Sequence, residues 1–161
     1  MPSLPPRSYA EILDDLDGLE KYLSQLGLPR PYDRLRRMIA NIREIERVYG
    51  ENRATSLEMS PRVEELVWSL VEGQEFAEIF RGVRDYDPDG AAPLLRKALS
   101  GPVRPTDEKE GSNSNLARNT IFELLLAARF RRAGASTRVG KKRILSSTMS
   151  EPASTSNASD H

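Results

Sequence analysis

Residues 114–134, SNLARNTIFELLLAARFRRAG, form the stretch that decides the predicted fold. Apolar residues recur in it at the spacing of one helix face, so it predicts an amphipathic helix. Its expected buried side comprises Leu116, Ile121, Leu124, Leu125 and Ala128, broadened by Phe122 and Leu126. Glu123 lies inside this apolar run, where a carboxylate is often half-buried and needs a partner such as Arg118, Asn119 or a metal ion. The alternative is a surface glutamate that pairs with a local side chain.

The composition of the residues after this helix does not predict a continued folded domain. Between residues 140 and 161, basic residues give way to a run of Ser, Thr, Asn and Ala. Such a composition is typical of a disordered segment. We therefore predict a disordered C-terminal tail over residues 140–161.

Upstream of this region, the sequence predicts further helices. Ser8 and Glu11 form a capping-box pattern that begins a helix ending near Gly27, and a second helix covers about residues 32–49. The short link between them predicts an antiparallel helical hairpin, with Arg34, Arg36 and Arg37 on its outer faces.

A third predicted helix begins at residues 60–61, and Gly73 is expected to break or kink it. A short helix follows at about residues 92–100. The expected buried stripe of the third helix is Val63, Leu66, Val67, Leu70 and Val71.

These segments predict a mainly α protein in four parts. A helical domain covers residues 1–101, and a linker covers residues 102–113. A segment that contains the 114–134 helix follows at residues 114–139, and the predicted disordered tail occupies residues 140–161.

Composition excludes several kinds of site and location. The chain has no cysteine, and its one histidine is His161, so thiolate zinc sites and Ser-His-Asp triads are excluded. No apolar run is long enough to span a bilayer, and the N-terminus lacks the apolar core of a secretory signal. We therefore predict a cytoplasmic protein without a membrane partner.

Positive charge is concentrated near the end of the 114–134 helix, although the net charge of the chain is zero. The residues Arg129, Arg131, Arg132 and Arg138 lie in a stretch without acidic residues. This patch is a candidate site for DNA phosphates. A solvated helix end is the alternative interpretation.

The pattern of residues 115–134, ARN-x-x-FEL…AA…AG, resembles the opening helix of bacterial members of the PD-(D/E)XK nuclease superfamily, which have a restriction-endonuclease-like α/β fold. The resemblance implies that Glu123 faces a metal site. In that superfamily, strands carrying an Asp and then a Glu-x-Lys motif follow, and they bind the divalent metal that assists phosphodiester cleavage. Mg²⁺ would be expected only in an intact member. This chain departs from the pattern, because no apolar strand with an Asp and no Glu-x-Lys motif follow Gly134, so residues 114–139 would form an incomplete nuclease-like segment.

A shifted reading frame after Gly140 is one explanation of the missing motif. With permitted codon choices, the shifted frame places an aspartate at position 144 and a Glu-x-Lys motif at positions 157–159. The alternative is a natural Ser/Thr-rich tail.

The functional prediction follows from these observations. We expect a truncated, non-catalytic relative of metal-dependent DNA nucleases, with Glu123 as a vestigial metal ligand, no catalytic residue and no cofactor. A helical interaction or regulatory module is the alternative, in which the 116–130 helix binds a protein partner or a second copy.

Overall fold

The computed structural model describes residues 7–28, 32–51, 60–84, 88–102 and 114–135, and all regular structure in these ranges is α-helical. The helices are α1 (Tyr9–Gln25), α2 (Asp33–Gly50), α4 (Val63–Val83), α5 (Pro88–Ala98) and α6 (Ser114–Arg132). The mainly α class is therefore confirmed for the described residues. The predicted tail, and the predicted linker beyond residue 102, lie outside the described residues.

Local chemistry determines where α1 begins and ends. The Ser8 hydroxyl accepts a hydrogen bond from the Glu11 backbone N–H at 3.3 Å, while the Glu11 carboxylate accepts one from the Ser8 N–H at 2.9 Å. This reciprocal pair is the predicted capping box, and it satisfies two backbone donors at the helix start. Gly27 follows the helix with φ of +67°, a conformation that glycine adopts without strain.

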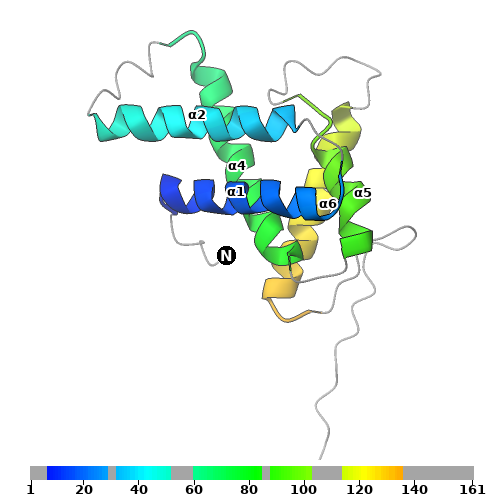
Figure 1. Cartoon of the computed structure of the whole chain (residues 1–161). Helices are drawn as coiled ribbons and strands as arrows, with labels where there is room; N and C mark the ends of the chain where they lie inside the picture. The colour runs from blue at the N-terminus through cyan, green and yellow to red at the C-terminus, as the bar shows by residue number, and fades with distance from the viewer. Residues whose placement is uncertain (1–6, 29–31, 52–59, 85–87, 103–113, 136–161) are drawn as a thin grey trace, which may run out of the picture.

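The helices form two layers (Figure 1). Helices α1 and α2 run antiparallel side by side, as the predicted hairpin requires, and α4 crosses both of them. Helix α6 packs against α4 and α5 on the other side of α4. Helix α4 is thus the central element, in contact with α1, α2 and α6.

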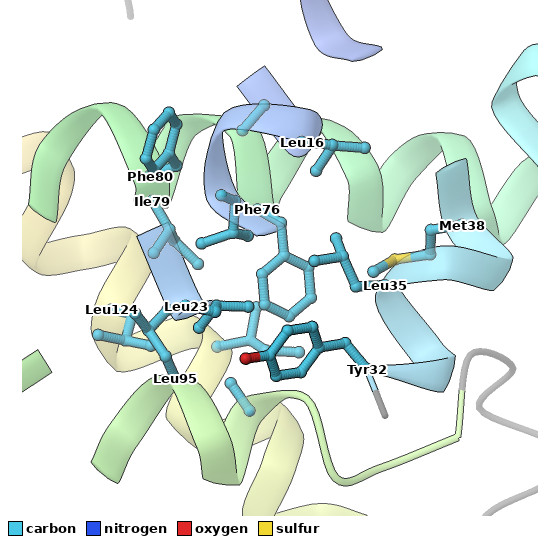
Figure 2. Close-up of a cluster of buried hydrophobic side chains, with 14 of the residues drawn as sticks. Leu16, Leu23, Tyr32, Leu35, Met38, Phe76, Ile79, Phe80, Leu95 and Leu124 are labelled. Carbon is cyan, nitrogen blue, oxygen red and sulfur yellow. The ribbon is translucent and has the colours of Figure 1, made fainter. Parts of the chain in front are cut away.

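One buried cluster joins these helices. Figure 2 shows Phe76 of α4 at its centre, surrounded by side chains from the other helices. Leu16 of α1, Leu35 of α2, Leu95 of α5 and Leu124 of α6 are all fully buried in this cluster. Helix α6 therefore shares a core with the helices that precede it, whereas the predicted domain boundaries stay a prediction.

The predicted stripe of α4 was wrong in part. Val63, Val67 and Val71 were expected inside, but they are 37%, 53% and 43% exposed, and of the stripe only Leu66 is fully buried. Helix α4 also runs unbroken through Gly73, whose added Cβ would lie 2.5 Å from an Ile42 side-chain carbon. Gly73 therefore permits the close crossing of α2 and α4 and does not end the helix. The short helix, α5, begins at Pro88, earlier than predicted.

Candidate functional site

The inner face of α6 is filled by other helices. Ala117, Leu124 and Ala128 on this face have no exposed surface. A Cβ added to Gly82 of α4 would lie 2.5 Å from the Ala128 Cβ and 2.7 Å from its Cα. The backbones of α4 and α6 therefore approach so closely that only glycine fits at position 82 without a shift.

The opposite side of α6 is apolar and exposed. Phe122 is 65% exposed and Phe130 is 39% exposed, while Leu126 between them is partly exposed. These three residues recur every four positions and form one line, which we call the outer face of α6. The predicted burial of Phe122 and Leu116 was wrong, since Leu116 is 42% exposed.

Glu123 is half-buried next to the outer face. Arg118, one of its predicted partners, contacts Glu72 at 3.3 Å, and its guanidinium lies 5.8 Å from the Trp68 ring centre. Among the described residues, no group of three His, Cys, Asp or Glu side chains could hold a metal ion. The role of Glu123 as a vestigial metal ligand stays a prediction.

Three residues of the predicted basic patch have partners on α4. Arg129 Nε and Nη2 each lie 3.3 Å from a different carboxylate oxygen of Glu78, and Arg132 lies 3.8 Å from the same side chain. Arg131 donates to the Gly82 carbonyl at 2.7 Å. Phosphate would therefore have to compete with Glu78 for two of these arginines. Arg138 lies outside the described residues, and DNA binding by the patch stays a prediction.

A buried charged cluster connects four helices, α6 among them. Arg34 of α2 and Glu72 of α4 form an ion pair at 2.7 Å, with side chains only 3% and 2% exposed. Arg34 also donates to the Ala98 carbonyl at the end of α5, at 3.0 Å. With Arg118 of α6 on the same carboxylate, this cluster ties α2, α4, α5 and α6 together. The prediction that Arg34 lies on an outer face was wrong.

A second polar network connects α2 to α4. The Asn41 amide donates to Glu65 at 3.0 Å and to the Ser69 hydroxyl at 2.8 Å, and all three side chains are buried. Arg62 donates to the Asn41 amide oxygen at 2.7 Å. The hydrogen bond from Asn41 lowers the pKa of Glu65, and Arg37 adds to this effect.

Glu75 lies on α4 between two other acids. Burial is the main cause that raises its pKa, and the carboxylates of Glu72 and Glu78 raise it further. Arg129 and Arg118 act in the opposite direction. The face of α4 that meets α6 thus carries three carboxylates among the arginines of α6.

Comparison with known proteins gives no relative. No family model matches the chain, and no curated protein or solved structure matches it significantly. Among the helices of the described residues, none is long and apolar enough to cross a membrane.

Proposed function

We propose that this chain is a helical protein-interaction module that binds a protein through the outer face of α6 without catalysing a reaction. The observation that carries the proposal is the 65% exposure of Phe122 on a helix whose other side is fully buried. Large aromatic side chains supply much of the binding energy at protein interfaces.

The inner face of α6 explains why the outer face is available. Since Ala117, Leu124 and Ala128 already pack against the rest of the fold, the helix is held rigidly in place. A line of apolar residues spaced by four positions on a rigid helix is a surface on which a partner helix can dock. A rigid surface also loses little conformational entropy on binding.

Photocrosslinking tests this proposal. A benzophenone amino acid replaces Phe122 in cells that make the protein, and in a matched control it replaces Val67, which is exposed to 53% on α4. We expect light-dependent adducts from position 122, lost when Phe130→Glu is added, and none of these adducts from position 67. If position 122 gives no adduct beyond those of the control, the proposal fails.

A second proposal is that α6 is related to the first helix of the PD-(D/E)XK nucleases and that the chain is a truncated, non-catalytic relative of them. The resemblance of residues 115–134 supports it, as does the position of Glu123 beside the outer face. Purified protein with supercoiled DNA and Mg²⁺ or Mn²⁺ should give no nicking, because one carboxylate does not hold a catalytic metal. Metal-dependent nicking that Glu123→Gln abolishes would show that the chain is catalytic. The gene sequence after codon 140, read in three frames, tests the truncation.

A further inference from the structure

We draw no further inference here: the strongest candidate, the row of Glu72, Glu75 and Glu78 carboxylates on the face of α4 that meets α6, belongs to the charged contacts already described, and no group among the described residues shows a ligand that it would bind.

Discussion

The buried ion pair between Arg34 and Glu72 predicts a large loss of stability when either partner is removed alone. Glu72→Leu leaves the Arg34 guanidinium, only 3% exposed, without its carboxylate. Removing one partner of a buried pair costs about 3–5 kcal/mol of unfolding free energy. Since small domains are stable by about 5–15 kcal/mol, this single change removes from about a fifth to all of the total.

The double variant Arg34→Met/Glu72→Leu should recover most of this loss. Both charges are then absent, and apolar side chains fill the same volume. The remaining cost is about 1–3 kcal/mol, because the Ala98 carbonyl loses the donor that lies 3.0 Å away. Arg118, which is 28% exposed, can turn its guanidinium to solvent.

Urea denaturation of the four proteins measures these free energies. Trp68, the only tryptophan, lies next to Arg118 and reports unfolding by fluorescence. Asp17→Asn is the control, because the Arg43–Asp17 pair is exposed and should contribute less than about 1 kcal/mol. If Arg34→Met and Glu72→Leu were additive in the double variant, the pair would not be energetically coupled, and our account of the cluster would be wrong.

Three further predictions concern other contacts. Gly82→Ala should destabilise the protein by about 1–3 kcal/mol in urea denaturation, because the added Cβ would lie 2.7 Å from the Ala128 Cα. Gly50→Ala is the control and should not destabilise the protein in this way, because no atom lies within 4 Å of the added Cβ. Equal losses of stability in the two variants would refute the close contact. The pKa of Glu75 is raised in the folded protein, so the folded protein binds the carboxyl proton of Glu75 more tightly than the unfolded chain does. The stabilisation that the protonated Glu75 contributes is therefore present below pH 4.5 and is lost as the pH rises through the higher folded-state pKa. Glu75→Gln should therefore be the more stable protein at pH 7, and a loss of stability there would contradict this. Ser8→Ala should cost about 1 kcal/mol of thermal or urea stability by removing the N-cap of α1, and an unchanged midpoint would exclude that role.

The start of α1 was predictable from the sequence because the residues that determine it are neighbours. Ser8 and Glu11 satisfy each other's backbone N–H groups within one turn. The hairpin of α1 and α2 was predictable for a similar reason, since the link between them is too short for another arrangement.

The buried face of α4 was not predictable in this way. Two stripes at helical spacing compete on this helix, one with Val67 and Val71 and one with Ser69 and Glu72. Apolar residues are the default choice for the interior. The structure buries the polar stripe because Arg34 supplies a partner from 38 residues earlier in the chain. No local sequence pattern predicts such a distant partner.

The buried side of α6 was not predictable for a different reason, because this helix carries apolar residues on two sides. The sequence placed Phe122 inside with Leu124, whereas the structure selects the side with the smaller residues. Gly82 is the reason, since its missing side chain admits Ala128 and draws that side of α6 against α4. A helix face bearing phenylalanines would not fit so close an approach.

The burial of the Ala128 side of α6 against α4 affects both proposals for the function of α6. A β-sheet of the nuclease kind would have to cover an apolar side of the helix, and the side with Ala117 and Ala128 is already covered by α4 and α5. The outer face is the remaining apolar side, so a sheet and a protein partner would compete for Phe122 and Phe130. A full-length product of the alternative reading frame should therefore lose the crosslinks at position 122. If that product instead kept the crosslinks at position 122, the sheet would have to lie elsewhere, and the resemblance of residues 115–134 to a nuclease helix would carry no structural meaning.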